Sequence, residues 1–490
     1  MIKIFQKVVC IIMVLILVLS LVSCGRTDEG WTTIITDQSA VSTDVTTITF
    51  AVPDFCFIDD NNLRLFNEEL LKDGYKYQLK LQHIVYDETI DYINDIEREF
   101  KNGTSDVAFL GLDDGSNSLI DLFNSGLLLN LDEILSSDKG KTVYESFPKA
   151  LWEAVKYNGQ IYSIPNTTAI DLGVYAAFNK DYIDEEAIEN WDGSIEGIYE
   201  MIKNVQWDDN VAPRFQYLIT DYEFGSMIGC EIRDGLLYDY DAMEIENPLE
   251  SEKFLGFLNV LEHMKNDGYM ADSLSYYLNT SYVVEKENLA SGKFLVLLSS
   301  GVPDDEFMKD NFSIKRIQPY QRPMIYASVG ISRNTGNIDE VMDFLGLLYG
   351  DGKYGNILLY GKQDEDYKLI DGLAVNVDGS ELQDRYYTEL CLDLYINIHP
   401  VKGNKYELFT HERKETYFSF YDSVKISPFV GFQPYYKNKS IIAQDIDDFL
   451  DTLTYTSLDE AVRRYSEKLK TDGMDDYLSA VKKQWETYHK

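Results

Sequence analysis

The stretch YNGQIYSIP, from Tyr157 to Pro165, is followed by the extended apolar segment LGVYAAFNKDY, from Leu172 to Tyr182. Gly159 is a turn residue, the residues after it alternate as in a β-strand, and the closing proline cannot donate a hydrogen bond to a sheet. One interpretation is an ordinary hairpin or an edge strand. The other is a crossover, at which the chain leaves one lobe of the protein and enters a second one.

Strand and helix patterns alternate on the amino-terminal side of this stretch. Strands are expected at Thr47–Phe55, Tyr75–Ile84 and Ser105–Gly111, with amphipathic helices between them. This order predicts a parallel sheet with helices on both faces. Leu119–Leu131 (LIDLFNSGLLLNL) is expected to form a further helix, and roughly Asp181–Ser313 is expected to be rich in helices.

Later segments carry clear start and stop signals. Ser291–Gly301 and Met324–Ser332 are expected to be strands. Asn337, with an acidic residue three positions later, is expected to cap one helix. Ser457 is expected to cap another, which would end at Gly473.

Candidate ligand-binding residues follow from the expected sheet, because ligands lie beyond the carboxyl ends of parallel strands. Those ends carry Asp54 and Phe55, and later Asp113 and Asp114, while Tyr175 lies at the crossover. Large rings near loops are further candidates, since a ring face can cover the C–H groups of a sugar, although each could instead be a core residue. These rings are Trp152, Trp207, Tyr222, Phe432 and Tyr435.

Composition and motifs argue against several function classes. The 490 residues carry a net charge of −39, which makes nucleic acid a poor partner. There is no H-E-x-x-H, P-loop, G-x-S-x-G or G-x-G-x-x-G motif in the required context. The five histidines share no ligand spacing, so neither a metal nor another cofactor is expected. These observations favour a binding protein over an enzyme, although a glycosidase with two carboxylates stays open.

The amino terminus predicts an exported, lipid-anchored protein. Basic residues precede an apolar run, Val8–Val22, which is short for a membrane-spanning helix. The run ends in LVSC, Leu21–Cys24, which resembles the lipobox of bacterial lipoproteins. This resemblance implies cleavage after residue 23 and diacylation of Cys24, a palmitate-type anchor that would hold the protein stably at the membrane. Residues 24–46, rich in Thr, Ser and Asp, are expected to be a flexible tether.

Three further cysteines, Cys56, Cys230 and Cys391, are widely spaced and odd in number. A disulfide framework is therefore not expected, and the three are predicted to be buried small hydrophobic residues.

In their order, several segments together resemble family 1 extracellular solute-binding proteins of ABC importers. The segments are SDVAFLG, NGQIYSIP with GVYAAFNKDYI, SVGISRNTGNIDEVMDFLGLLY and GNILLYGKQDEDYKLIDG. The end, ISPFVGFQPYYKNKSI with SEKLKTDGMDDYLSAVKKQWETY, is similar to a C-terminal domain of unknown function in a Gram-positive subset of these lipoproteins.

The resemblance implies an α/β, two-lobed, periplasmic-binding-protein-like fold (type II). Each lobe would hold a mixed, mostly parallel sheet covered by helices, with hinge crossovers between the lobes. Lobe 1 would comprise residues 47–165 and 322–400, and lobe 2 residues 166–321 and 401–490 with the C-terminal helical segment.

The implied function is capture of a ligand, an oligosaccharide, in the interlobe cleft and its delivery to the transmembrane subunits of an ABC permease. The protein would be a monomer, lipid-anchored at the extracellular face of a bacterial membrane. Alternatives are a peptide or amino-sugar binder, a sensor partner of a membrane kinase, or a surface glycosidase.

Overall fold

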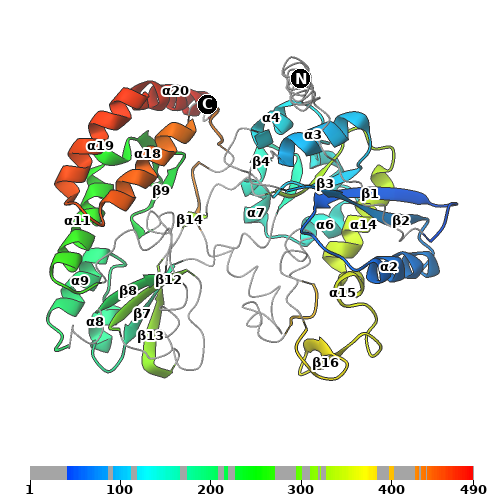
Figure 1. Ribbon diagram of the computed structural model, residues 1–490, viewed down its shortest axis with the longest axis horizontal. Coiled ribbons are helices and arrows are strands. Elements are labelled where there is room, and N and C mark those ends of the chain that lie inside the picture. The colour runs from blue at the N-terminus through cyan, green and yellow to red at the C-terminus, as the bar shows by residue number, and fades with distance from the viewer. Residues whose placement is uncertain are drawn as a thin grey trace, which may run out of the picture.

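The computed structural model describes residues 41–86, 92–111, 118–165, 174–207, 214–218, 227–270, 294–300, 310–317, 320–321, 327–382, 397–401, 425–429, 432–437 and 439–488. The described elements form two bodies (Figure 1). The described residues between 41 and 165 and between 327 and 401 form the first lobe, and those between 174 and 317 and between 429 and 488 form the second. Each lobe is therefore built from two separate parts of the chain.

The first lobe is organised around a five-stranded mixed sheet of order β2–β1–β3–β15–β6. Strand β1 runs parallel to β2 and β3, whereas β15 runs antiparallel to β3 and to β6. Consequently β6 points in the same direction as β3. The strands are β1 (Thr46–Pro53), β2 (Tyr77–Ile84), β3 (Val107–Phe109), β6 (Ser163–Pro165) and β15 (Ala327–Ile331).

Helices cover both faces of this sheet, as the alternation in β1 requires. Phe50 and Val52 pack in one apolar cluster with α2, α7, α14 and α15, while Ala51 packs in another with α3 and α4. The prediction of a doubly covered sheet is thus confirmed. The helices are α2 (Asp60–Lys72), α3 (Tyr92–Asn102), α4 (Ser118–Asn124), α5 (Asp132–Leu135), α6 (Lys141–Glu145), α7 (Lys149–Ala154), α14 (Ile338–Gly350) and α15 (Gly352–Tyr360), with hairpins β4 (Lys156–Tyr157)–β5 (Gln160–Ile161) and β16 (Tyr367–Ile370)–β17 (Leu373–Asn376).

The second lobe contains a four-stranded mixed sheet of order β13–β7–β12–β8 and a three-stranded antiparallel sheet of order β11–β10–β9. Its core joins residues from the middle of the chain to the C-terminal helices, which pack on the smaller sheet. The elements are β7 (Val174–Asn179), α8 (Glu185–Glu189), α9 (Ile195–Lys203), β8 (Phe215–Leu218), β9 (Cys230–Arg233), β10 (Leu236–Asp239), β11 (Glu244–Glu246), η1 (Pro248–Glu250), α11 (Glu252–Asn266), β12 (Val296–Ser300), β13 (Phe312–Arg316), α18 (Lys439–Thr452), α19 (Leu458–Asp472) and α20 (Met474–Tyr488).

The stretch from Tyr157 to Tyr182 contains both features that its pattern allowed. Asn158 and Gly159 have positive φ angles of 49° and 77° and turn the β4–β5 hairpin. Strand β6 then ends at Pro165 in the first sheet, and β7 begins at Val174 in the second. Another short pair, β14 (Tyr320–Gln321) with β18 (Lys425–Ile426), is parallel. Strand β14 follows β13 in the sequence, and β18 precedes the C-terminal helices of the second lobe.

Several sequence predictions need correction. Helix α4 ends at Asn124, and Leu128 instead bridges Ser332 beside β15, because the buried leucines complete the sheet edge. The described residues in the middle of the chain are less helical than expected, since they include the β9–β11 sheet. The sheets are mixed, but parallel pairs are only two of four in the first lobe and one of three in the larger sheet of the second.

The helix signals near the chain's end are mostly confirmed. Ser457 accepts a hydrogen bond from the backbone N–H of Glu460, and Gly473 ends α19 with a φ of 98°. Asn337 precedes α14 but its side chain does not cap the helix. Its amide instead donates to Asp106, 3.4 Å away, because the polar end of β3 lies beside it.

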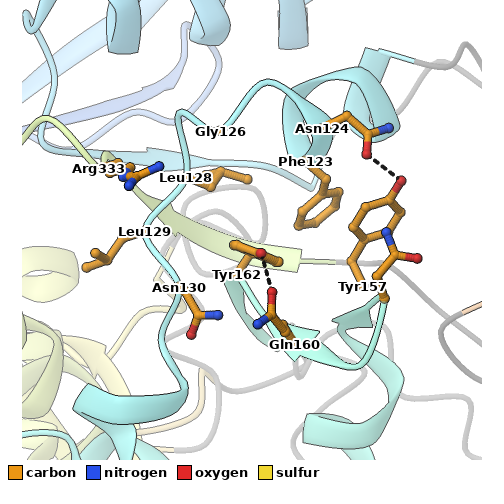
Figure 2. A pocket seen from close by; sticks show the side chains of 11 residues that line it. Phe123, Asn124, Gly126, Leu128, Leu129, Asn130, Tyr157, Gln160, Tyr162 and Arg333 are labelled. Atoms are coloured by element: carbon orange, nitrogen blue, oxygen red, sulfur yellow. Dashed lines mark hydrogen bonds between the residues drawn. The ribbon is translucent and has the colours of Figure 1, made fainter.

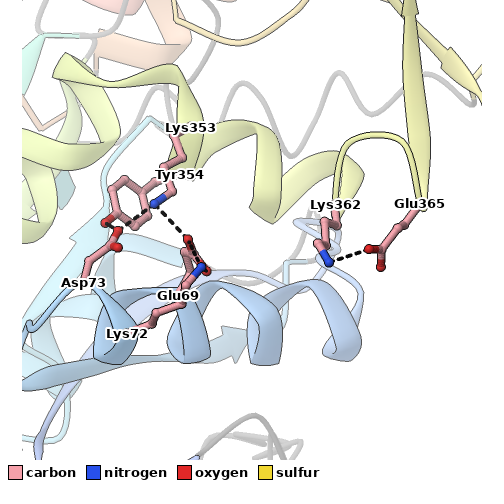
Figure 3. A network of polar contacts seen from close by, with 7 residues as sticks. All are labelled: Glu69, Lys72, Asp73, Lys353, Tyr354, Lys362 and Glu365. Carbon is pink, nitrogen blue, oxygen red and sulfur yellow. Dashed lines mark hydrogen bonds and ion pairs between the residues drawn. The ribbon is translucent and has the colours of Figure 1, made fainter.

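An ion-pair network joins α2 to α15 across the first lobe (Figure 3). Lys353 Nζ lies 2.9 Å from Glu69 Oε1 and 2.6 Å from Asp73 Oδ2, and the Tyr354 hydroxyl donates to the same Asp73 oxygen. Hydrogen bonds from Lys353 and then from Lys72 lower the pKa of Glu69. Burial opposes the positive charge of Lys353, but its two carboxylate partners raise its pKa. The network therefore ties the two helices together when these groups are charged.

Cys56 and Cys230 are free and buried, as predicted, and burial raises the pKa of Cys230 to about 12. Cys391 and Cys24 lie outside the described residues. In the described ranges, no helix combines the length and hydrophobicity needed to cross a bilayer.

Candidate functional site

The carboxyl ends of β1, β2 and β3 lie at the edge of the first sheet where the chain passes to the other lobe. Pro165, at the end of β6, is opposite Ala327, at the start of β15. Because β15 is antiparallel to β3, its first residue lies beside the carboxyl end of β3. The residues that follow β1 and β2 therefore lie at the junction with the second lobe. We call this end of the sheet, where β1, β2, β3 and β6 end and β15 begins, the crossing edge.

The second lobe presents a matching edge. Strand β7 begins at Val174, opposite Ser300 at the end of β12. Arg316, at the end of β13, pairs with Tyr175. Strand β8 is parallel to β12 and so ends at the same side. The start of β7 and the ends of its neighbours thus form the edge nearest the crossover.

Three aromatic residues and an aspartate follow β1 and β2 at the crossing edge of the first lobe. We call Asp54, Phe55, Phe57 and Tyr86 the end cluster. The backbone N–H of Asp54 donates to Ile84 O at 2.8 Å, which continues the β1–β2 pairing by one residue. The Asp54 carboxylate accepts from the backbone N–H of Tyr86 at 3.1 Å. These two bonds fix the loops after β1 and β2 against each other.

The rings of the end cluster are held at an edge and still open to solvent. Phe55 contacts Tyr86 edge-to-face, with centroids 5.6 Å apart at 87°. Tyr86 is 40% exposed and Phe57 is 65% exposed. Exposed rings beside an exposed carboxylate suit a sugar, because the rings can cover C–H groups while the carboxylate accepts from hydroxyls. The cluster therefore provides ring faces and a carboxylate that can bind a ligand.

Tyr175 is the sequence-predicted residue that the second lobe contributes. It is half-buried in β7, between Ser299 of β12 and Arg316 of β13. Its position at the start of the first strand after the crossover places it at the edge nearest the first lobe. A phenol and a guanidinium at this edge add hydrogen-bonding groups opposite the end cluster.

Trp152 and Phe432 are core residues, which corrects their prediction as ligand-stacking rings. Trp152 is 1% exposed, stacks on Tyr144 with centroids 5.4 Å apart, and donates through Nε1 to the Tyr144 carbonyl. Phe432 is 3% exposed and packs on Trp485 and Tyr488 of α20. Both rings are used to attach local segments to the apolar clusters.

Trp207 lies at the end of the second-lobe sheet opposite the start of β7. It contacts Tyr182 edge-to-face, with centroids 5.0 Å apart. Tyr182 follows the end of β7, so it lies opposite the edge where β7 begins. Tyr435 is 49% exposed, and its backbone exchanges two hydrogen bonds with the Gln484 side chain. It stays a candidate.

Asp113, Asp114 and Tyr222 lie outside the described residues, so their predicted roles stay predictions. Sequence reasoning missed Phe57 and Tyr86. The rule that selected Asp54 also applies to Tyr86, which comes two residues after the end of β2. Phe57 lies only four residues beyond β1, yet nothing in its local sequence distinguishes it from the buried Ile58.

No group of three or more His, Cys, Asp or Glu side chains within the described ranges is arranged to hold a metal ion. The end cluster itself contains one carboxylate and no histidine or cysteine side chain. Its chemistry is that of hydrogen bonding and ring contact.

Comparison with known proteins gives the fold a context. No known protein-family model matches the chain. A carbohydrate ABC transporter substrate-binding protein from Streptococcus pneumoniae serotype 4 is 24% identical over 393 residues, which are 74% of this chain and 77% of that protein. The crystal structure of the N-glycan transport solute binding protein from S. pneumoniae matches with a TM-score of 0.61 and 20% identity, covering 91% of this chain and 99% of the other. Its complex with Man5GlcNAc matches with a TM-score of 0.51 and 20% identity, covering 91% and 98%. The chain therefore has the two-lobed α/β fold of solute-binding proteins.

Proposed function

We propose that this chain is the extracellular solute-binding protein of an ABC importer and that it captures an oligosaccharide between its lobes. The relative that it matches in sequence is a carbohydrate ABC transporter substrate-binding protein, and a neighbour in structure binds Man5GlcNAc. The same two-lobed fold, shared over nearly the whole chain, supports the proposal. A binding protein of this kind transfers its ligand unchanged, so no enzymatic activity is expected.

The observation that carries the proposal is the end cluster. Exposed rings and an exposed carboxylate lie after two parallel strands, at the edge from which the chain crosses to the second lobe. In α/β sheets this is the position where ligands bind. The ligand would be held by the end cluster and by Tyr175 at the opposing edge. Rotation of the lobes about the crossing segments would then enclose it.

We further propose the lobe limits given by the sequence pattern, with residues 47–165 and 322–400 in one lobe and residues 166–321 and 401–490 in the other. The division of the described residues between the apolar clusters supports these limits, except that Val401 packs in the cluster of the first lobe. Delivery requires a partner that spans the membrane, which would be the transmembrane subunits of an ABC permease. The protein would act as a monomer.

We propose that residues 1–23 are a lipoprotein signal peptide, that Cys24 is diacylated, and that residues 24–46 tether the lobes outside the membrane. The LVSC sequence after the apolar run supports this. The test is fractionation of cells that express the Cys24→Ala variant. We expect the variant to leave the membrane fraction, because the thiol that carries the lipid is gone. An unchanged membrane fraction would refute lipidation at this residue.

A second candidate ligand class is favoured by one feature of the same cluster. Asp54 is an exposed carboxylate, and a chain of charge −39 attracts cations. An amino-sugar or a peptide amine could therefore replace the neutral hydroxyl groups of a sugar at this position. A sensor that presents its bound ligand to a membrane kinase would use the same site.

The deciding experiment is a thermal-shift screen of the purified protein followed by calorimetry. The panel contains Man5GlcNAc and other neutral glycans, oligomers of glucosamine, and short peptides. A ligand present at 100 times its dissociation constant should stabilise the protein by about 2.7 kcal/mol. Stabilisation by neutral glycans supports the proposal, and stabilisation by glucosamine oligomers or peptides alone supports the second class. If no member of the panel binds, the assignment to oligosaccharide or peptide capture is wrong.

A further inference from the structure

A separate cavity of about 540 Å³ opens on the first lobe (Figure 2). It lies between the end of α4, the extended segment after it, the β4–β5 hairpin and the residue that follows β15 by two positions. Its volume is within the range of about 300–1,000 Å³ that small-molecule sites occupy. The residues used below are Phe123, Asn124, Tyr157, Gln160, Tyr162 and Arg333.

This cavity and the end cluster lie at opposite ends of the strands of the first sheet. Arg333 follows the end of β15, and its backbone N–H donates to Leu127 O. Strand β15 begins at the crossing edge with Ala327. Arg333 lies in the turn two residues beyond β15, and the five residues of this strand alone span roughly 15 Å at about 3.3 Å per residue. A ligand in the cavity would therefore not contact the end cluster.

One wall of the cavity is aromatic. Phe123 is buried and stacks on Tyr157, with centroids 5.1 Å apart at 18°. Tyr162 packs on the other side of the phenylalanine, 6.2 Å away and edge-on. The two tyrosines are half-buried, so each ring is supported by the core and still offers surface to a ligand. This arrangement suits the apolar face of a sugar ring.

Among the side-chain amides around the aromatic wall, the oxygens accept hydrogen bonds while the NH₂ groups do not donate any to described residues. The Tyr157 hydroxyl donates to Asn124 Oδ1 at 2.9 Å, and the Tyr162 hydroxyl donates to Gln160 Oε1 at 2.5 Å. The backbone N–H of Asp132 donates to Asn130 Oδ1 at 2.9 Å. Three amide oxygens are thus occupied, while their NH₂ groups form no hydrogen bond with the described residues. Figure 2 shows these side chains around the opening.

Arg333 adds a positive charge to this donor-rich surface. It is exposed, and within the described part of the chain its guanidinium forms no ion pair. Acidic residues outnumber basic ones by 83 to 44, so a cation that faces a cavity without a carboxylate partner among these residues is distinctive. Free amide donors and a guanidinium together favour a ligand rich in acceptors and negatively charged.

We propose that this cavity is an accessory binding site for a sugar that carries a carboxylate, of the hexuronic acid type. The sugar ring would lie against Tyr157 and Tyr162, and its carboxylate would accept from Arg333 and from the neighbouring amide groups. The site is independent of the interlobe ligand, because the two positions lie at opposite edges of the sheet. It would let the first lobe hold an acidic glycan unit while the interlobe site binds its own ligand.

The test is calorimetry and saturation-transfer NMR on the purified protein with D-glucuronate, D-glucose and acetate. We expect one glucuronate to bind, glucose to bind at least about tenfold more weakly, and acetate likewise, since each lacks one half of the recognition. Arg333→Gln and Asn124→Asp should each weaken glucuronate binding by about tenfold or more, because one removes the cation and the other adds a like charge.

Two control variants distinguish binding at this cavity from a general charge effect and from binding at the interlobe site. Arg98→Gln removes a half-buried cation of α3 that pairs with Asp95, and Phe57→Ala removes a ring of the end cluster. Both should leave glucuronate binding unchanged. The proposal is overturned if glucuronate does not bind, if glucose or acetate binds equally well, or if Arg333→Gln binds as the parent does. Loss of glucuronate binding in Phe57→Ala would instead place the acidic sugar at the interlobe site.

Discussion

Replacing Phe57 with alanine should weaken oligosaccharide binding by about 5- to 30-fold while leaving stability nearly unchanged. The phenyl ring is 65% exposed, so that fraction of it is available to be covered by a ligand. Burying a whole phenylalanine side chain contributes about 1.5–3 kcal/mol, and this fraction corresponds to about 1–2 kcal/mol. Each 1.4 kcal/mol changes the dissociation constant by a factor of about ten. The folded protein loses little, since truncation of an exposed ring changes unfolding by about 0.5 kcal/mol or less.

The assay is calorimetric titration of Phe57→Ala with whichever neutral glycan of the panel binds the parent, together with its melting temperature. The control is Tyr455→Ala, because Tyr455 is 86% exposed and follows α18 in the second lobe. It should bind as the parent does. A dissociation constant for Phe57→Ala within twofold of the parent, with the control unchanged, would refute the location of the site. A large fall in melting temperature would show that the ring is structural.

Three further predictions concern the scaffold. Trp152→Ala should destabilise the protein by about 3–5 kcal/mol in urea unfolding, because the ring is buried. Trp152→Phe should destabilise it less, because most of the buried ring remains. Equal urea midpoints for Trp152→Ala and the parent would contradict core packing of this ring. Lys353→Met should lower stability at pH 7. The Glu69 carboxylate, whose pKa is lowered, stabilises the fold at pH values above its ordinary pKa of 4.5, and this stabilisation is lost as the pH falls through the lowered pKa. The difference in unfolding free energy between variant and parent should therefore shrink in acid. A difference that stays constant with pH would exclude the ion pair with α2 as its cause. Gly235→Ala should destabilise the protein by more than about 1 kcal/mol, because the φ of Gly235 is 78° and an added Cβ would lie 2.9 Å from the backbone of α18. Gly256→Ala in helix α11 should stabilise it by about 0.5–1 kcal/mol, because an added Cβ there would have nothing within 4 Å. Similar effects at both sites would refute the argument from close approach.

The sequence was informative wherever structure is decided by neighbouring residues. The alternation in Thr46–Pro53 and Val174–Asn179 located strands, and Ser457 and Gly473 marked the limits of a helix. Asn158–Gly159 set a hairpin turn through its positive φ angles. The pattern from Tyr157 to Tyr182 left a hairpin and a crossover equally open, and the two-lobed fold was implied by the resemblance to solute-binding proteins.

The sequence was less informative where distant segments meet. Leu128 reads as part of a helix, but it bridges Ser332, which only the folded first sheet brings beside it. Trp152 and Phe57 are both aromatic residues near turns, yet one packs under Tyr144 and the other is left at the crossing edge. Local pattern cannot separate them, because burial depends on which helix covers which face of the sheet.

The sequence by itself determined where most strands and helices form, the turn at residues 158–159 and the expectation that residues after parallel strands bind a ligand. Tertiary structure alone decided which rings line the crossing edge, that Trp207 lies at the opposite end of its sheet, and that Arg333 meets an aromatic and amide-lined cavity. The physical reason is that turns and caps are satisfied within a few residues, whereas exposure and site geometry arise from strand pairings between parts of the chain that are far apart in sequence.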